Sequence, residues 1–369
     1  MERAVARVDY DAIRANCTKL KALLGEESEL CAVVKADGYG HGDLDAAGAA
    51  LAGGAGRLAV ATAVEAERIA RRFPHVPLLT MGALTAAEVE IVLSARSEVA
   101  VWREPFRALL ADRARALGEP VRVHVKYDSG MGRLGSRDPE QVLALARACA
   151  ADPDLELAGV WTHLATADEL DSDFFEEQLD RFDRVAAAVR AEFPGVLVHA
   201  ANSAAAFRDR RSHYDMARCG VAVYGLDPFQ SDPVSRGLEP ALSLRSYVAD
   251  VKRFEPGDTA GYGQRWAAPV ETLVGVIPVG YGDGVRRALS NNAEVLVGGR
   301  RRPLVGTISM DNLTVDLGRD AEVETGAEAV LIGAQDGERI FAEEVAARLD
   351  TINYEVTCGI SSRVPRRAA

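Results

Sequence analysis

The sequence predicts a (β/α)₈ barrel of the TIM type followed by a mainly β domain. Between residues 30 and 226, eight short β-like segments alternate with alanine-rich helical segments. Strands that alternate with helices form a parallel sheet, and eight such units at this length fit a closed barrel. After residue 226 the sequence changes to closely spaced strand-like segments punctuated by Gly and Pro, which is typical of a mainly β domain.

The strand candidates of the barrel are short and rich in apolar residues. In chain order they are 30–36, 57–63, 76–82, 97–102, 121–127, 155–165, 196–203 and 215–225. In the stretches between them, such as 104–118 and 173–193, apolar residues recur at the spacing of an amphipathic helix. These stretches are therefore the expected outer helices.

A proline-rich segment, 227–240, separates the two patterns. Since 369 residues are too many for one ordinary core, we expect one domain at 1–229 and a second at 230–369. The first few residues are candidates to pair with the second domain. The later strand candidates are 242–254, 271–280, 293–299, 312–318 and 327–333, with one short helix at 342–349.

Composition narrows the class of protein. The formal net charge of −12 argues against nucleic acid or an anionic membrane as a partner. There is no run of about 18 apolar residues that would span a bilayer, and the first residues show no signal-peptide pattern. Five cysteines without a close pair, and six scattered histidines, predict a cytoplasmic protein with neither disulfides nor a catalytic metal.

Polar residues stand at the predicted strand ends, where the active site of such a barrel gathers. Each has an ordinary explanation by itself; Asn202, for example, is a good helix cap. Together they form a candidate site. The residues are Lys35, Lys126, Arg133, His163, Asn202, Ser203, Arg218, Gly220 and Val221.

Lys35 suggests the chemistry of this site. A lysine in an enclosed pocket loses its proton more readily and becomes a nucleophile, and its natural use is a Schiff base with an aldehyde such as pyridoxal phosphate. Barrels often bind phosphate beside their last two strands. Ser203 and the backbone N–H groups near Gly220 and Val221 are candidate donors there.

The segment AVVKADGYGHG, residues 32–42, closely resembles the pyridoxal-phosphate lysine signature of alanine racemases. Eight further blocks resemble that family in the same order, and together they cover most of the chain. They are 123–135, 162–169, 199–205, 216–226, 260–263, 277–284, 306–312 and 351–356.

This resemblance implies a pyridoxal 5′-phosphate enzyme that interconverts L-alanine and D-alanine as a head-to-tail homodimer with shared active sites. Lys35 would hold the cofactor as an aldimine and act as one base, and Tyr262 of the partner subunit would be the opposite base. Arg218 would face the pyridine nitrogen, with His163 linked to it. The cofactor-binding residues would be Lys35, Tyr39, His163, Asn202, Ser203, Arg218, Gly220, Val221 and Tyr354.

The resemblance also implies contacts with the substrate. Arg133 and Met310 would bind its carboxylate, and Lys126 matches a lysine that many members carry as a carbamate. Three residues, Asp168, Tyr281 and Arg287, match the access corridor of the family. The product D-alanine would serve cell-wall peptide (peptidoglycan) synthesis.

Three alternatives remain open at this point. A barrel-type pyridoxal-phosphate decarboxylase would carry a glutamate where Arg218 stands, and a non-catalytic carrier of the cofactor would resemble the barrel alone. A broad-specificity amino-acid racemase would share the same residues. Thr307 stands where many family members have arginine, so the range of substrates stays open.

Overall fold

The computed structural model describes residues 2–369, which form two compact units. The barrel unit comprises Ile13–Gly38 and Asp43–Val223. The second unit comprises the residues up to Ala12, Tyr39–Gly42 and Tyr224–Ala369. The division into functional domains at residues 229 and 230 stays a prediction.

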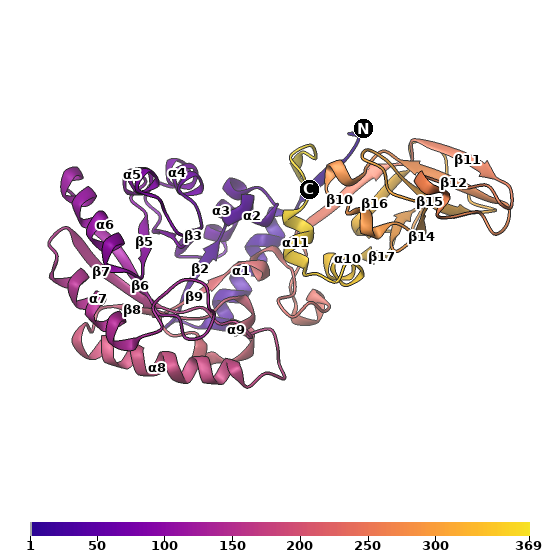
Figure 1. Cartoon of the computed structure of the whole chain (residues 1–369). Helices are drawn as coiled ribbons and strands as arrows, with labels where there is room; N and C mark the ends of the chain where they lie inside the picture. Colours follow the sequence, from indigo (N-terminus) through magenta and orange to yellow (C-terminus); the bar gives the residue numbers. More distant parts are fainter. Residues whose placement is uncertain (1) are drawn as a thin grey trace. The chain divides into compact units, whose positions relative to one another are not determined.

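The barrel unit contains an eight-stranded parallel sheet (Figure 1). Each strand overlaps one of the eight predicted segments, so the predicted fold class is confirmed. Several strands are shorter than predicted because the polar residues that follow them belong to loops and turns. The strands are β2 (Glu29–Val33), β3 (Arg57–Val60), β4 (Leu78–Thr80), β5 (Glu98–Val101), β6 (Val121–Lys126), β7 (Leu155–Trp161), β8 (Leu197–His199) and β9 (Met216–Cys219).

The sheet curls into a nearly closed ring. Its order is β8-β7-β6-β5-β4-β3-β2-β9, so the last strand pairs with the first. Between β8 and β9 single backbone bonds complete the ring: Asp215 N–H donates to the Val198 carbonyl at 3.0 Å and Arg218 N–H to the Ala201 carbonyl at 2.9 Å. The carboxyl ends of all eight strands therefore meet at one face of the barrel.

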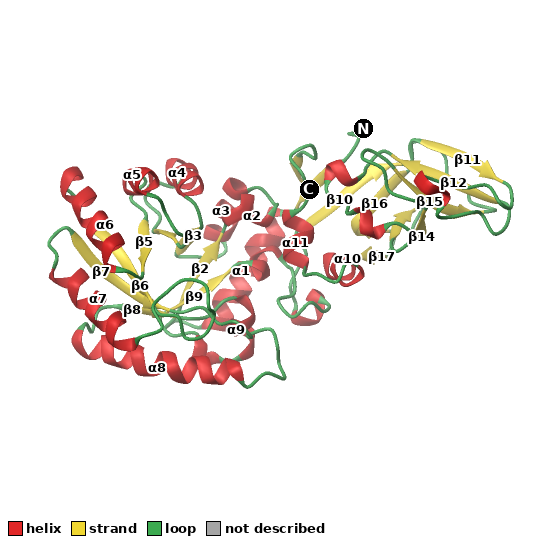
Figure 2. Ribbon diagram, viewed as in Figure 1, coloured by secondary structure: helices red, strands yellow, loops and turns green. Residues whose placement is uncertain are grey.

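Helices alternate with these strands and lie outside them (Figure 2). Helices α4 and α5 begin with a capping box, in which Thr62 pairs with Glu65 and Thr85 pairs with Glu88. These pairs satisfy N–H groups of the first turn that have no partner within the helix. The helices are α1 (Tyr10–Leu24), α3 (Asp43–Ala52), α4 (Ala63–Arg72), α5 (Ala86–Ser94), α6 (Glu104–Leu117), α7 (Pro139–Ala151), α8 (Phe174–Glu192) and α9 (Ser203–Arg208).

The second unit is built on a ten-stranded sheet. The strands are β1 (Val5–Val8), β10 (Leu242–Tyr247), β11 (Asp250–Phe254), β12 (Thr272–Ile277), β13 (Glu294–Val297), β14 (Arg300–Val305), β15 (Leu313–Gly318), β16 (Glu328–Gln335), β17 (Glu338–Ile340) and β18 (Arg366–Ala368). Strand β1 runs antiparallel to β10 and parallel to β18, so the two ends of the chain join the same sheet. Two short helices, α10 (Ala342–Arg348) and α11 (Asn353–Cys358), complete the unit.

The part of the chain that the structure describes, residues 2–369, holds no helix with the length and hydropathy that a bilayer crossing requires. It also holds no cluster of three or more His, Cys, Asp or Glu side chains arranged as metal ligands.

Candidate active site

Lys35 opens a left-handed turn directly after strand β2. The segment α2 (Lys35–Tyr39) contains Ala36 at φ 53° and ψ 50°, and Asp37 at φ 54° and ψ 47°. A left-handed conformation costs an L-residue roughly 1–2 kcal/mol, so its surroundings must hold it in place. Here Glu65 accepts the Ala36 N–H at 2.7 Å and the Val34 carbonyl accepts the Gly38 N–H at 3.0 Å. The strand thus ends at Val33, and the prediction of a strand to residue 36 is wrong.

Arg218 on strand β9 is a buried cation, 3% exposed. Its NH1 donates to His199 Nδ1 at 2.7 Å, and its NH2 donates to the carbonyls of Thr162 and Ala200, each at 2.9 Å. NH2 also lies 3.4 Å from His163 Nδ1. Burial lowers the pKa of Arg218 to about 10, so the side chain remains charged at neutral pH.

The five N–H donors of Arg218 are not all used within residues 2–369, since NH1 makes one hydrogen bond and Nε makes none. Because guanidinium groups only donate, the Nε–H is available to an acceptor that the chain itself does not provide. The structure also brings His163 and Arg218 together, as the resemblance implied.

Lys126 lies on strand β6 and is 2% exposed. Its Nζ stands 3.6 Å from the centre of the Trp161 ring. Burial lowers the pKa of Lys126 well below its ordinary value, with Arg218 and Arg133 as the next causes. The amine is therefore neutral more readily than that of a surface lysine.

Asn202 and Ser203 lie where strand β8 leads into helix α9. Asn202 Oδ1 accepts the Ala205 N–H at 2.9 Å, which is an ordinary helix cap. Ser203 Oγ accepts the Gly220 N–H at 3.0 Å and the Ala222 N–H at 3.4 Å. Because its oxygen already accepts twice, the hydroxyl proton of Ser203 is oriented to donate elsewhere.

Tyr39 belongs to the second unit and packs among aromatic rings there. Its ring centre lies 5.1 Å from that of Tyr224 and 6.0 Å from that of Tyr354. The backbone of Tyr39 is also left-handed, with φ 53°. At the next residue, a Cβ on Gly40 would collide with the Thr357 carbonyl, so only glycine fits.

Tyr262, Tyr281 and Met310 of the second unit are exposed large side chains, at 71%, 43% and 52%. Two backbone bonds link the last two segments: Tyr281 N–H donates to the Ser309 carbonyl at 3.1 Å and Gly282 N–H to the Met310 carbonyl at 2.9 Å. Exposed apolar side chains gathered in this way are common at interaction sites. Three further predicted residues, Arg133, Asp168 and Arg287, are likewise exposed.

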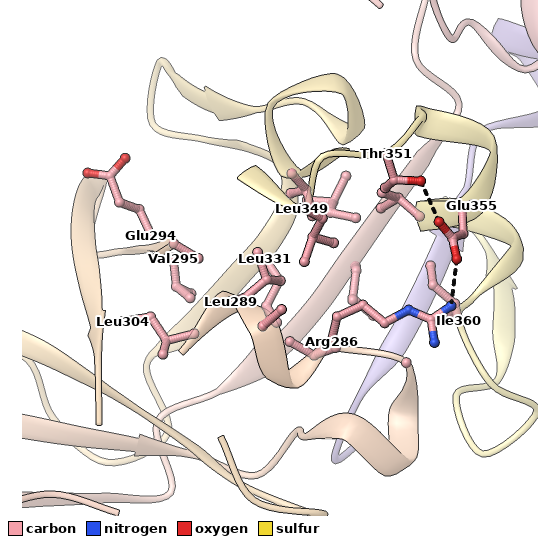
Figure 3. A pocket seen from close by; sticks show the side chains of 18 residues that line it. Arg286, Leu289, Glu294, Val295, Leu304, Leu331, Leu349, Thr351, Glu355 and Ile360 are labelled. Atoms are coloured by element: carbon pink, nitrogen blue, oxygen red, sulfur yellow. Dashed lines mark hydrogen bonds and ion pairs between the residues drawn. The ribbon is translucent and has the colours of Figure 1, made fainter. Parts of the chain in front are cut away.

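An apolar cavity lies inside the second unit (Figure 3). Arg286 stands 3.8 Å from Glu355 at its rim. None of the predicted site residues lines this cavity, so it plays no part in the candidate site. Its labelled aliphatic lining consists of Leu289, Val295, Leu304, Leu331, Leu349 and Ile360.

Trp161 and His124 were not among the residues predicted from the sequence. The ring of Trp161 stacks on His199 at 5.6 Å between centres and lies under the guanidinium of Arg218 at 4.7 Å. One signal was available for His124, because residues two apart on a strand point to the same side, and Lys126 follows it by two. Nothing comparable marked Trp161.

Comparisons with known proteins agree across the whole chain. Family models of the alanine racemase N-terminal and C-terminal domains match residues 8–228 and 241–368. The alanine racemase of Symbiobacterium thermophilum is 42% identical over 364 residues, covering 98% of this chain and 96% of that protein. That of Geobacillus stearothermophilus is 39% identical, covering 98% and 92%. The crystal structure of alanine racemase from Streptomyces lavendulae matches with a TM-score of 0.94 at 35% identity, covering 100% of this chain and 97% of that one.

Proposed function

This chain belongs to the alanine racemase family, and from that premise we propose how its residues interconvert L-alanine and D-alanine. We assign pyridoxal 5′-phosphate as the cofactor, Lys35 as its anchor, and Lys35 and Tyr262 as the two bases. Arg218 carries the assignment, because this buried cation keeps its Nε–H for an acceptor outside the chain.

The donors of the barrel unit suit a phosphorylated pyridine. Arg218 offers Nε–H to a ring nitrogen, and Ser203 offers a hydroxyl proton to a phosphate oxygen beside the backbone of Gly220 and Val221. When bound, pyridoxal phosphate withdraws electrons from the substrate and makes its Cα–H acidic. The roles of Tyr39 and Tyr354 as further phosphate ligands, and of Asn202, rest on the family resemblance.

The two bases serve opposite faces of the substrate. Racemisation removes a proton from one face of Cα and delivers a proton to the other, and two positioned groups do this directly. The amine of Lys35 takes or returns the proton on one face, and the phenol of Tyr262 does so on the other. Since an unperturbed tyrosine has a pKa of about 10, Tyr262 needs cationic or hydrogen-bonding neighbours in the assembled site.

Arg218 influences how quickly the proton returns to the substrate Cα. An arginine does not give up its own proton readily, so it leaves the ring nitrogen it faces without one. The electron demand on Cα stays moderate, which favours quick return of the proton over side reactions. The decarboxylase alternative requires a glutamate in this position, and Arg218 argues against it.

The remaining barrel residues hold the substrate and the cofactor ring. We assign the substrate carboxylate to Arg133 and to the backbone N–H of Met310, and the flank of the ring to His163. Lys126, as a carbamate, would orient Arg133. The buried and readily neutralised amine of Lys126 supports this role, because carbamate formation requires an unprotonated amine.

We infer a homodimer in which Tyr262 and Met310 of the partner subunit complete each site. Their exposure in the single chain, together with that of Tyr281, supports this assembly, since exposed apolar side chains that lie together often mark an interaction site. Asp168, Tyr281 and Arg287 would line the access corridor.

We further propose that the enzyme works in the cytoplasm and supplies D-alanine for peptidoglycan synthesis. All five cysteines are free thiols, as is usual in a reducing compartment. We also propose that the chain has two functional domains, one at residues 1–229 and the other at residues 230–369.

The test is proton NMR of L-alanine in D₂O with the protein and added pyridoxal phosphate, followed by chiral analysis. Loss of the Cα proton signal together with formation of D-alanine is the expected result. Tyr262→Phe should keep cofactor binding and lose most exchange from the L enantiomer, while exchange from the D enantiomer falls less. Exchange in the unsubstituted protein without any D-alanine would refute the two-base assignment.

A further inference from the structure

A chain of buried hydrogen bonds crosses the barrel interior from Glu98 to Arg218. Glu98, the first residue of β5, lies 2.7 Å from His124 Nε2. His124 Nδ1 lies 2.9 Å from His199 Nε2, and His199 Nδ1 lies 2.7 Å from Arg218 NH1. All four residues are at most 4% exposed. The chain therefore connects the amino ends of the strands with the site at their carboxyl ends.

Chemistry dictates the direction of every bond in this chain. Arg218 can only donate, so His199 Nδ1 is an acceptor and carries no proton. A neutral His199 then carries its proton on Nε2 and donates to His124 Nδ1. By the same reasoning His124 carries its proton on Nε2 and donates to the carboxylate of Glu98. Burial lowers the pKa of both rings, which keeps each of them neutral with a single ring proton.

The barrel is shaped to hold this chain. A Cβ on Gly159 of strand β7 would collide with the ring of His124 at Nδ1, so the missing side chain makes room for the ring. Trp161, two residues along the same strand, stacks on His199 with an angle of 8° between the rings. The two histidines thus have one packed orientation each.

The far end of the chain carries a net negative charge. Glu98 accepts from Arg57 and, at 2.8 Å, from Arg122. Arg57 also stands 3.5 Å from Glu29, and Arg122 pairs with Glu156. The carboxylates of these three glutamates and the guanidinium groups of the two arginines together carry one net negative charge at the amino ends of the strands. No carboxylate within residues 2–369 forms an ion pair with Arg218, so the histidine chain is its link to a counter-charge.

We propose that Glu98 is a positioning residue for the racemase reaction: through His124 and His199 it fixes the proton positions and the plane of the Arg218 guanidinium. The fixed plane aims Nε–H at the ring nitrogen of the cofactor. This inference rests on the proposed role of Arg218. It assigns a catalytic consequence to the amino ends of the strands, where a barrel otherwise holds residues that serve stability.

The ring protons can be observed directly by ¹⁵N NMR of the full-length protein with labelled histidine. His124 and His199 should each show a protonated Nε2 and a bare Nδ1, with assignments from the loss of signals in His124 variants. A protonated Nδ1 on either ring would overturn the proposal. This measurement does not depend on activity. It therefore distinguishes an error in the proposed hydrogen bonds between Glu98 and Arg218 from an error in the cofactor assignment.

Four variants then test the consequence for catalysis. Glu98→Gln keeps the shape and removes the charge, and His124→Leu removes both ring nitrogens. Each should lower kcat about 10-fold while KM for alanine changes less than about twofold. His124→Gln retains one donor and one acceptor and should recover kcat to within about threefold. Glu29→Gln removes a carboxylate of the same cluster outside the chain and should leave kcat unchanged.

The four variants still test the proposal if Glu98→Gln does not fold. His124→Gln can retain the hydrogen bonds to Glu98 and His199, whereas His124→Leu, of similar size, cannot. Equal kcat in His124→Leu and His124→Gln would overturn the proposal, as would an unchanged kcat in a folded Glu98→Gln protein. A second signature is the absorption band of the bound cofactor, which should shift in Glu98→Gln and His124→Leu and stay in place in Glu29→Gln.

Discussion

The hydroxyl of Thr307 donates a hydrogen bond to the backbone carbonyl of Tyr262 at 2.8 Å. Thr307 is 5% exposed, whereas the Tyr262 side chain is 71% exposed. Thr307, which stands where the resemblance implies arginine in many members, is thus engaged with the backbone of the proposed second base. The bond holds the segment from which the phenol projects.

Thr307→Val should lower kcat about fivefold, because it removes a bond worth roughly 1 kcal/mol while keeping the shape of the side chain. Thr307→Ser keeps the hydroxyl and should stay within about twofold of the unsubstituted enzyme. The measurement is kcat for racemisation in both directions. Equal rates for Val and Ser at this position would show that the bond does not support catalysis.

The two glycines beside Tyr262 offer a matched pair of substitutions. Both have a positive φ, 72° for Gly261 and 73° for Gly263, but ψ is −178° at Gly261 and 8° at Gly263, and the extended conformation of Gly261 is one that essentially only glycine adopts. A Cβ on Gly261 would lie 2.7 Å from the Thr307 nitrogen, whereas one on Gly263 meets nothing closer than 3.7 Å. Gly263→Ala should therefore cost about 1 kcal/mol of stability from backbone strain alone.

Gly261→Ala should cost more than Gly263→Ala, and it should lower kcat further because the segment that carries Tyr262 must shift. Thermal unfolding and kcat of the two variants provide the comparison. If Gly261→Ala is the milder of the two, the close approach to Thr307 is not a constraint on this segment.

Lys126 should form a carbamate when the protein is equilibrated with ¹³C-labelled bicarbonate, visible as a ¹³C NMR signal. Burial lowers the pKa of this lysine, so its amine is unprotonated at a pH where surface lysines are charged. Lys126→Met should abolish the signal, and a signal that persists in this variant would assign the carbamate to another amine.

Glu98 should make the stability of the protein sensitive to acid. Burial by itself raises the pKa of Glu98, but the hydrogen bond from His124 and the neighbouring cation Arg57 together outweigh burial and lower the pKa from 4.5 to about 2. The folded state thus binds its proton more weakly than the unfolded state. The stabilisation is complete above pH 4.5 and is lost as the pH falls toward 2, amounting to about 3 kcal/mol.

Glu98→Gln should flatten the loss of stability between pH 4.5 and pH 2. Urea unfolding at several pH values in this range measures the effect, with Glu29→Gln as the control. A slope that is unchanged in Glu98→Gln would mean that other carboxylates are responsible for the acid sensitivity.

The sequence by itself determined the alternation of strands and helices, and hence the barrel. It also determined the places of Lys35, His163, Ser203 and Arg218 near strand ends, because period and strand order follow from local patterns of apolar residues. The short helix near residue 342 followed from the same kind of pattern. The motifs around these residues were sufficient to indicate the family, which the comparisons confirm.

Only the tertiary structure decided which side chains meet. Glu98 and Arg218 are 120 positions apart, and nothing in either segment predicts that two histidines connect them. The left-handed turn at Lys35 depends on Glu65 of another helix, and the bond between Thr307 and Tyr262 depends on a close approach of two loops. Such contacts form only after packing brings distant segments together, since local sequence governs the period of an element but not its neighbours.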